Sequence, residues 1–322
     1  MGRRVRLIVR IAVGIVILAL VLQSVDFAAA IRLFASIRIG PLLALCVLQV
    51  ARRVLMAYKS NILLRARSIR ISLLEAVRIY YVGYSLGAMT PGAIGADVYK
   101  VAALQRFRKA DVIVSTIILE RLIGLAVISG VALATIPWST NYLAKVSPAA
   151  IGLIVAIAPI ASLVVVVSLS PSILEGLSRR LPFLFRKRMG QRLRQFYLSY
   201  LEASQYPRAI LIFVMLTAFE LFVLIIINYL AAQALAIDVS LLYFVCVLPL
   251  LHILLRLPIS IQGLGVQEGM FAFFLIAAGY TATDGVAISF LLRVVEVVLG
   301  IVPGAILLWA ARHHKPFLSG AR

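Results

Sequence analysis

Charged residues inside long apolar stretches are the residues of this sequence with the clearest chemical potential. Each of three apolar runs carries such charges: Glu120 and Arg121, Arg293 and Glu296, and Glu220. An ionisable side chain at the centre of a bilayer costs about 2.5–3.5 kcal/mol on insertion scales, so its presence needs a reason. Two interpretations stay open. The acids and bases nearly balance and could pair to hold helices together, or they could line a path for a charged substrate.

The composition predicts an integral membrane protein. Of 322 residues, 63% are hydrophobic and 14% are charged, whereas a globular domain carries about 25% charged residues. The mean hydropathy is +1.07. The apolar runs 7–22, 151–169 and 210–230 reach the roughly 17–25 residues that cross a bilayer. The net charge of +20 does not indicate a nucleic-acid partner, because no soluble basic module is present.

The positions of the basic residues predict the orientation. The positive-inside rule places the basic clusters in the cytoplasm; they are 3–10, 52–70, 100–109, 179–208 and 312–322. The segments poor in basic residues are expected outside; they surround Asp26, 138–145, Asp238 and Asp284. Both termini are thus predicted to be cytoplasmic, in a multi-pass protein of the bacterial inner (cytoplasmic) membrane. The basic start and the Ala28–Ala30 run could describe a signal peptide, but the many later spans favour an uncleaved first helix.

Counting crossings between these assignments predicts six spanning helices and two hairpins. The predicted spans are 7–23, 39–58, 110–136, 148–170, 208–236 and 286–311. The segments 72–106 and 239–282 remain, and each has both ends on one side of the membrane. Pro91 and Gly92 interrupt the first segment, and Pro258 and Gly263 interrupt the second. Since Pro and Gly disfavour helix interiors, these are the expected turning points, and the short second arms suit re-entrant half-helices.

The order span, hairpin, span occurs twice and predicts an inverted repeat. The fold class expected is an all-α polytopic membrane protein, as one domain over residues 1–322, with repeats at 39–136 and 208–311. A basic cytoplasmic loop at 171–207 separates the repeats. Asp97 begins the second arm of one hairpin and Glu268 that of the other, and Arg121 and Arg293 follow after a similar interval.

The hairpin tips are the predicted substrate site. The N-terminal ends of both second arms should point at the membrane interior, where their N–H groups favour an anion. Inverted-repeat transporters bind substrate at such broken helices near the midplane. Arg121, Arg293, Arg256 and Lys100 would suit a phosphate group, while Asp97 and Glu268 could orient them or exchange protons. The full predicted set is Pro91, Gly92, Gly95, Asp97, Lys100, Glu120, Arg121, Arg256, Gly263, Gly265, Gln267, Glu268, Arg293 and Glu296.

No cofactor or metal is predicted. His252, His313 and His314 lack metal-ligand spacing, and Cys46 and Cys246 do not indicate a disulfide. The segment 263–268 lacks the third glycine and the strand context of a dinucleotide fingerprint, and the sequence contains no Walker A motif.

At several motifs the chain resembles the lysylphosphatidylglycerol synthase transmembrane family, also described as a flippase-like membrane domain family. The motifs lie in 61–76, 91–100, 119–124 and 263–269, and the resemblance covers about residues 40–310. In this family the domain occurs alone or fused to catalytic domains, and in the multiple peptide resistance factor it is linked to moving aminoacylated phosphatidylglycerol between leaflets. The sequence ends soon after the last predicted span and lacks an aminoacyltransferase domain, so the resemblance implies lipid translocation rather than synthesis.

Three functions stay open from the sequence. The first is a flippase or scramblase that passes an anionic phospholipid or polyprenyl-phosphate-type lipid between leaflets through a midplane site. The second is a membrane-embedded enzyme that uses Asp97, Glu120 or Glu268 as acid or base on a lipid-linked substrate. The third is a non-transporting partner of a lipid-synthesis enzyme.

Overall fold

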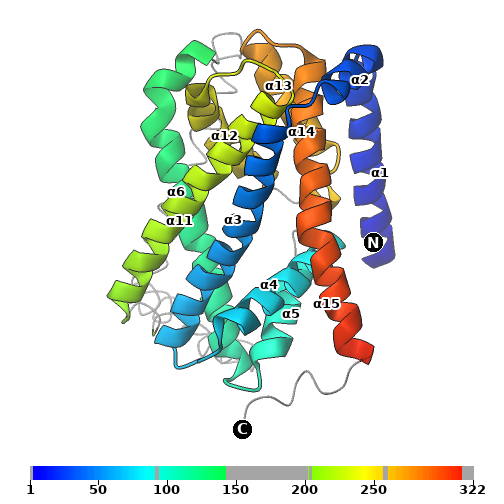
Figure 1. Cartoon of the computed structure of the whole chain (residues 1–322). Coiled ribbons are helices and arrows are strands. Elements are labelled where there is room, and N and C mark those ends of the chain that lie inside the picture. The colour runs from blue at the N-terminus through cyan, green and yellow to red at the C-terminus, as the bar shows by residue number, and fades with distance from the viewer. Residues whose placement is uncertain (1–2, 91–93, 143–201, 203–204, 257–259, 314–322) are drawn as a thin grey trace, which may run out of the picture.

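The computed structural model describes residues 3–90, 94–142, 202, 205–256 and 260–313. Within these residues every regular element is a helix and no strand occurs, as the all-α prediction requires. The helices form an elongated bundle whose long members run between its two ends (Figure 1). The predicted span 148–170 and most of the basic loop 171–207 lie outside the described residues.

Four long helical segments are apolar enough to cross a membrane. They are α3 (Ile39–Ala66), most of α6 (Ala110–Tyr142), α11 (Pro207–Ala234) and the continuous segment Ala282–Ala311. The last consists of α14 (Ala282–Glu296), a π-helical turn (Val297–Ile301) and α15 (Val302–His313). They coincide with four of the six predicted spans, so the arrangement of six spans and two re-entrant hairpins stays a prediction in its details.

Helix α3 differs from the predicted span in one informative respect. The positive-inside rule assigns the basic residues of 52–70 to a cytoplasmic cluster and predicts a span that ends at 58. Instead α3 continues to Ala66, because no Gly or Pro after Pro41 interrupts it. Arg52, Arg53 and Lys59 therefore lie in the body of a helix, and α3 packs against α11 over much of its length.

The N-terminal segment bends sharply. Helix α1 (Arg3–Leu22) is followed by α2 (Phe27–Ala35), and the two make an angle of 88° across residues 23–26. Asp26 begins α2 as its N-cap, with Oδ1 accepting from the N–H of Ala29 at 3.0 Å. In Figure 1, α1 runs along the side of the bundle and α2 crosses its upper end. A fifth spanning segment exists if this bent pair is one span.

The first predicted hairpin is a pair of short helices, α4 (Leu73–Ala88) and α5 (Ile94–Leu104). Ser72 caps α4 by accepting from the N–H of Glu75 at 3.1 Å. The two helices pack closely because glycines face the neighbouring backbone: a Cβ on Gly95 would lie 2.5 Å from the carbonyl oxygen of Leu86. The interruption between the helices falls at the predicted place.

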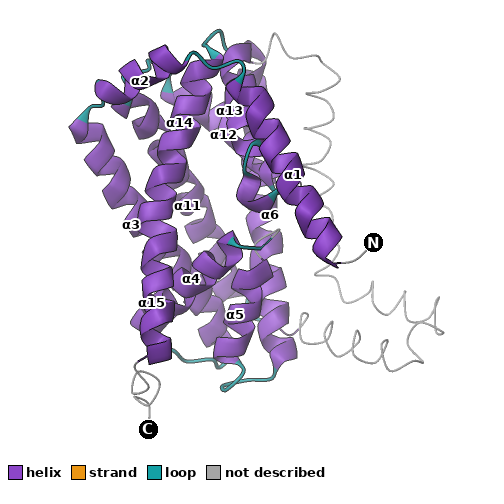
Figure 2. Ribbon diagram, turned by 90° about the vertical axis from the view of Figure 1, so that its right-hand side faces the viewer, coloured by secondary structure: helices purple, strands orange, loops and turns teal. Residues whose placement is uncertain are grey.

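The second predicted hairpin consists of α12 (Leu241–Leu255) and α13 (Val266–Ala277), joined by a segment with a 3₁₀ turn at Ile261–Gly263. Gln262, Gly263 and Gly265 have positive φ there, which only glycine adopts without strain. Figure 2 shows α4 and α5 in the lower part of the bundle and α12 and α13 in the upper part. The two helix pairs thus enter the bundle from opposite ends.

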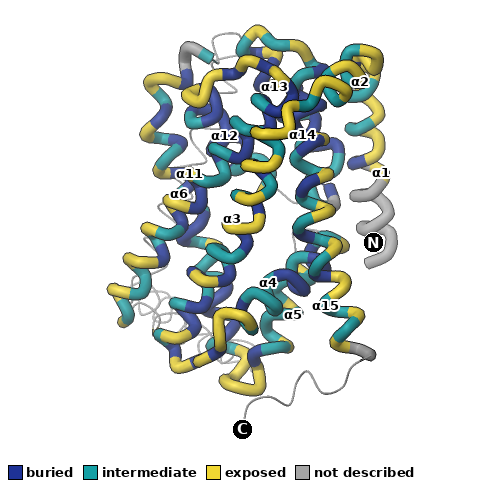
Figure 3. The backbone as a smooth tube through the Cα atoms, viewed as in Figure 1, coloured by how far each residue is buried: buried dark blue, intermediate teal, exposed yellow. Residues whose placement is uncertain are grey.

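The main core surrounds the second helix pair. Helix α12 buries most of its side chains, among them Phe244, Cys246 and Leu251, and dark blue marks this part of the tube in Figure 3. The cluster continues through the apolar faces of α11, α13 and α14. Burying polar groups in such a core is costly unless they are paired, so the paired charges described next stand out.

Candidate functional site

The first hairpin carries an exposed ion pair. Asp97, in the first turn of α5, accepts from Nη2 of Arg121 on α6 at 2.6 Å. The side chains are 33% and 49% exposed, respectively. An exposed pair of this kind contributes about 0–1 kcal/mol, so it leaves both charges available for a third group.

An apolar pocket of about 540 Å³ adjoins this pair. Its walls come from α5 and α6, and its lining residues are Asp97, Val98, Val101, Ala102, Gln105, Val114, Ile117, Ile118 and Arg121. One end of the pocket is therefore ionic and the remainder is aliphatic apart from Gln105. This division is the one that an amphiphile with a charged headgroup requires.

Arg256 brings a second arginine to the same turn of α6. It caps the C-terminal end of α12, and its Nη2 lies 3.4 Å from the point where a Cβ on Gly124 would stand. Gly124 follows Arg121 by one helical turn, so the two arginines approach α6 at neighbouring positions. Arg256 is exposed, and its guanidinium has no ion pair or hydrogen bond with another described residue.

Glu120 does not pair with its neighbour Arg121. It points instead to Lys100 of α5, whose Nζ lies 2.9 and 2.7 Å from its two carboxylate oxygens. Ser60 of α3 donates to Glu120 at 2.9 Å and accepts from Lys100 at 2.7 Å. The Lys100–Glu120 pair is largely buried and ties α3, α5 and α6 together beside the exposed pair.

The second hairpin carries a buried counterpart of the Asp97–Arg121 pair. Glu268, in the first turn of α13, accepts from Nε of Arg293 on α14 at 2.5 Å. Its other oxygen accepts from the N–H of Gly265 at 2.8 Å. Arg293 also reaches the carbonyl oxygens of Gln262 and Gly263 at 3.5 Å. Glu268 is 3% and Arg293 17% exposed, so this pair holds the tip in shape.

Helix α1 covers this second tip. A Cβ on Gly265 would collide with the carbonyl oxygen of Gly14 and would lie 2.8 Å from the nitrogen of Leu18. Gly269, one turn further along α13, faces Val21 and Ile17 at ordinary or slightly tight contact distances. The glycines at 265 and 269 therefore let α1 approach the tip closely.

The remaining predicted residues divide between these places. Gly95 begins the α5 turn, where its N–H donates to Oγ1 of Thr90 at 2.8 Å. Gln267 is half-buried on α13, and Glu296 accepts from Nη2 of Arg53 on α3 at 3.1 Å. Pro91 and Gly92 lie outside the described residues. The predicted set therefore occupies more than one cluster, with Asp97, Arg121 and Arg256 grouped at α6 and Glu268, Gly263, Gly265 and Arg293 grouped under α1.

Sequence reasoning missed the buried bases of α3. Arg53 is 1% exposed; its Nη2 donates to Glu296 at 3.1 Å, and its guanidinium lies 3.6 Å from the ring centre of Tyr84. The π-helical turn brings Gly300 against this guanidinium, where a Cβ would lie 2.6 Å from Nη2. The signal available in the sequence was the uninterrupted helical pattern from 42 to 66, which places these bases inside the span.

A second missed cluster surrounds Glu220 of α11. Arg52 donates from Nε to one carboxylate oxygen at 2.6 Å, and Lys59 donates to the other at 3.3 Å. Lys59 also donates to Thr217 at 3.3 Å. All of these groups are largely buried, so the cluster satisfies the charges that α3 and α11 bring into their interface.

These features define a polytopic helical membrane protein with two helix pairs that enter the bundle from opposite ends, each with an acid–arginine pair at its second arm. The chain belongs to the family described as the lysylphosphatidylglycerol synthase TM region, whose model matches residues 7–304. It is therefore a membrane protein of a lipid-related family. A search of the curated proteins found no match.

Proposed function

We propose that this protein translocates an anionic lipid or lipid-linked phosphate between leaflets, in the manner of a flippase or scramblase. One observation carries the proposal. The guanidinium of Arg256 lies against Gly124, one turn after Arg121 on α6, and Arg121 lines an open apolar pocket. The two arginines come from the two halves of the chain. A headgroup held between them would thus contact both halves at once.

Charge at this place favours an anion. Asp97 neutralises part of Arg121, while the guanidinium of Arg256 forms no hydrogen bond or salt bridge with another described residue and feels the more distant charge of Glu220. Arginine presents several donors in a planar fork that matches phosphate geometry. The phosphate of a lipid therefore finds a complementary group here, and no covalent step is needed to explain the arrangement.

The apolar walls of the pocket suit the rest of the lipid. Val98 on α5 is strongly exposed, and Val101, Ile117 and Ile118 line the same pocket. Acyl chains can stay against such walls and in the surrounding bilayer while the headgroup moves past the charged end. This division lowers the cost of carrying a charged headgroup through hydrocarbon.

The enzyme alternative would gain support from convergent carboxylates that could hold a metal ion. Among the described residues, no group of three or more His, Cys, Asp or Glu side chains lies close enough to do so. A partner role would gain support from a fully packed interior, whereas a pocket adjoins Asp97 and Arg121. Neither alternative has an observation that favours it over translocation.

The test is lipid exchange in liposomes that contain the purified full chain. Headgroup-labelled phosphatidylglycerol in both leaflets is exposed to a membrane-impermeant quencher, and the fraction quenched is followed over time. Wild-type protein should raise the quenched fraction above that of empty liposomes. Arg256→Gln should slow exchange about tenfold or more, because a lost charge-assisted contact of about 1.5–3 kcal/mol changes a rate by at least that factor.

A matched control comes from the same hairpin. Glu75 and Arg106 form an exposed ion pair away from the pocket, so the double variant E75Q/R106Q should exchange lipid as fast as wild type. Absence of protein-dependent exchange for any labelled anionic lipid would overturn the proposal. Full activity in Arg256→Gln together with Arg121→Gln would overturn the assigned site.

A further inference from the structure

The long apolar segment Ala282–Ala311 changes its helical pattern near the middle. Between α14 and α15, residues Val297–Ile301 form a π-helical turn, in which the N–H of Val302 donates to the carbonyl oxygen of Val297. Pro303 follows directly; it has no N–H, so one carbonyl of the turn loses its usual α-helical donor. A π-helical turn is a place where a helix bends, and it is frequent at functional sites. The segment therefore consists of two α-helical halves joined at a less stable point.

The first half, α14, is attached to the second hairpin. Gly285 faces α13 so closely that a Cβ on it would lie 2.6 Å from the Cα of Ala272. Near the other end of α14, Arg293 donates to Glu268 of α13 at 2.5 Å. Helix α14 thus contacts α13 close to both of its ends, and we expect the two helices to move as one unit.

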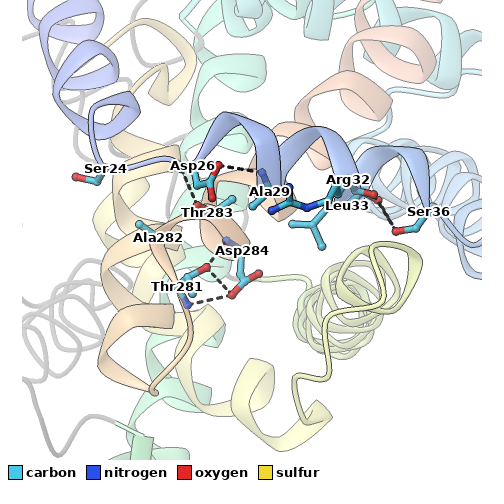
Figure 4. A pocket seen from close by; sticks show the side chains of 10 residues that line it. All are labelled: Ser24, Asp26, Ala29, Arg32, Leu33, Ser36, Thr281, Ala282, Thr283 and Asp284. Atoms are coloured by element: carbon cyan, nitrogen blue, oxygen red, sulfur yellow. Dashed lines mark hydrogen bonds between the residues drawn. The ribbon is translucent and has the colours of Figure 1, made fainter.

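The start of α14 is also fixed at the upper end of the bundle. The N–H of Asp26 donates to Oγ1 of Thr283 at 3.0 Å, which joins the α1–α2 bend to the first turn of α14 (Figure 4). Residues of α2 and of the start of α14 line an open pocket of about 510 Å³ around this bond. Helix α14 is therefore held by other elements from its first turn onward.

The second half, α15, is attached to the first hairpin instead. Ser85 of α4 donates from Oγ to the carbonyl oxygen of Ile301 at 2.6 Å, at the end of the π-helical turn. Gly304 lies against the same helix, because a Cβ on it would collide with the carbonyl oxygen of Tyr81. Figure 2 shows α15 and α4 in the lower part of the bundle, where they pack against each other. One long segment thus carries a different hairpin on each side of its π-helical turn.

Arg53 of α3 holds the two halves together at the turn. Its Nη2 donates to Glu296, the last residue of α14, at 3.1 Å, and its guanidinium lies 3.6 Å from the ring centre of Tyr84 on α4. Gly300, within the turn, leaves room for this guanidinium, since a Cβ there would lie 2.6 Å from Nη2. One buried side chain therefore contacts α14, the turn and the first hairpin at once.

The buried polar groups around Arg53 are not all paired. Arg53 is 1% exposed, and its Nε donates no hydrogen bond to a described residue. Gln49, one turn earlier on α3, has a buried Oε1 that accepts none from these residues either. Buried donors and acceptors without partners cost free energy and need an explanation. A second arrangement of the helices, in which these groups find partners, would remove that cost.

We infer that the π-helical turn is a hinge between the two hairpins, and that the Arg53–Glu296 ion pair is the latch that holds the arrangement described above. When this pair separates, α15 and the first hairpin change direction relative to α14 and the second hairpin. Helix α5 packs on α4 and forms one wall of the pocket beside Asp97, so the movement would change the width of that pocket. The inference goes beyond the proposed function, because the movement is defined by contacts within the protein.

The test is the distance between two spin labels, one on each hairpin, in the detergent-solubilised full chain. With Cys46 and Cys246 replaced by alanine, Leu74→Cys on α4 and Phe273→Cys on α13 provide label sites at exposed positions. Pulsed electron paramagnetic resonance should find mainly one distance when the latch is intact. Arg53→Gln should raise the population of a second distance about tenfold or more, because it removes a charge-assisted hydrogen bond. An unchanged single distance in Arg53→Gln would overturn the inference.

Arg52→Gln is the matched control. Arg52 precedes Arg53 on α3 and forms a largely buried ion pair of its own, which joins α3 to Glu220 of α11. This variant loses the same charge from the same helix and should keep the single distance. A second distance of equal population in both variants would contradict the latch, because any lost charge in α3 would then loosen the bundle.

A measurement on the unmodified chain keeps the hinge testable if Arg53→Gln does not fold. In hydrogen–deuterium exchange followed by mass spectrometry, residues 297–304 should exchange faster than the flanking residues 284–295 and 305–311, because the hydrogen bonds of a hinge open more often. Uniform protection over the whole segment would overturn the inference. Neither measurement depends on lipid exchange, so failure of transport and failure of the hinge are separate results.

Discussion

The two hairpins carry an acidic side chain at a corresponding position, and each acid pairs with an arginine on the following long helix. The pairs differ in their surroundings. Asp97 and Arg121 are exposed beside a pocket, whereas Glu268 and Arg293 are buried and also bind the tip. The same sequence spacing therefore gives an accessible charge pair in one half and a structural one in the other.

Helix α1 accounts for part of this difference. It packs on α13 and on the tip before it, with Gly265 and Gly269 allowing its close approach. On the first hairpin, the described residues of α5 leave Val98 and Ile94 exposed. Helix α1, which lies outside both predicted repeats, thus covers the tip of the second hairpin, whereas residues of α5 in the first hairpin stay exposed.

The largest expected effect is on the buried pair. Glu268→Gln leaves Arg293 buried without its partner and should lower the free energy of unfolding by about 3–5 kcal/mol. The corresponding Asp97→Asn in the exposed pair should cost about 1 kcal/mol or less. Thermal unfolding of both variants in the same detergent measures the difference. Equal losses would show that the two pairs are not distinguished by burial.

The next effect tests the cover provided by α1. Gly265→Ala should destabilise by about 1–3 kcal/mol beyond the backbone strain of a positive φ, because its Cβ collides with α1. Gly279→Ala is the matched control, with φ +97° and no atom near its Cβ, and should show about 1–2 kcal/mol of strain alone. If both variants lose the same stability, α1 does not cover the tip tightly.

Accessibility gives a third comparison. With Cys46 and Cys246 replaced by alanine, Val98→Cys and Val266→Cys place one thiol at each hairpin. Val98 is exposed and Val266 is buried, so a hydrophilic maleimide should modify the first thiol faster. Mass spectrometry of timed samples measures both rates. Faster modification at 266 would reverse the assignment of the open and closed halves.

The smallest effect concerns the ion pair at the open end of the first hairpin, away from its tip. Glu75 and Arg106 are both solvent-exposed to a considerable degree, so Glu75→Gln should change stability by about 1 kcal/mol or less and should not affect lipid exchange. The same unfolding and liposome measurements apply. A larger loss would mean that this pair fastens α4 to the α5 end more strongly than its exposure indicates.

Much of the local architecture was predictable from the sequence. Hydropathy located four of the long helical segments, and Pro and Gly marked both interruptions, since these effects act within a few residues. Helix α3 continues eight residues beyond the predicted end of the span at 58, so the basic residues of this segment lie on a helix and not in a loop. The charge of Arg53 can be buried within α3 because its guanidinium donates to Glu296 and lies over the ring of Tyr84. Both of these partners are remote in sequence.

The candidate site was predictable in its residue types and less so in its grouping. Helix N-termini and basic residues pointed to both tips. The spacing alone could not separate the partner of Glu120, which is Lys100, from its sequence neighbour Arg121. Adjacent residues on a helix point in different directions by about 100°, so neighbours in sequence face different partners.

The sequence by itself determined the class: an apolar, helical membrane chain with interrupted segments and an acid–arginine spacing that occurs twice. Those properties follow from composition, helical periodicity and local backbone preference. The tertiary structure alone decided which pair is open, that Arg256 meets the Gly124 turn, and that α2 and the start of α14 line a second, open pocket with charged residues. Such contacts join residues up to 257 positions apart, and their formation depends on how whole helices pack.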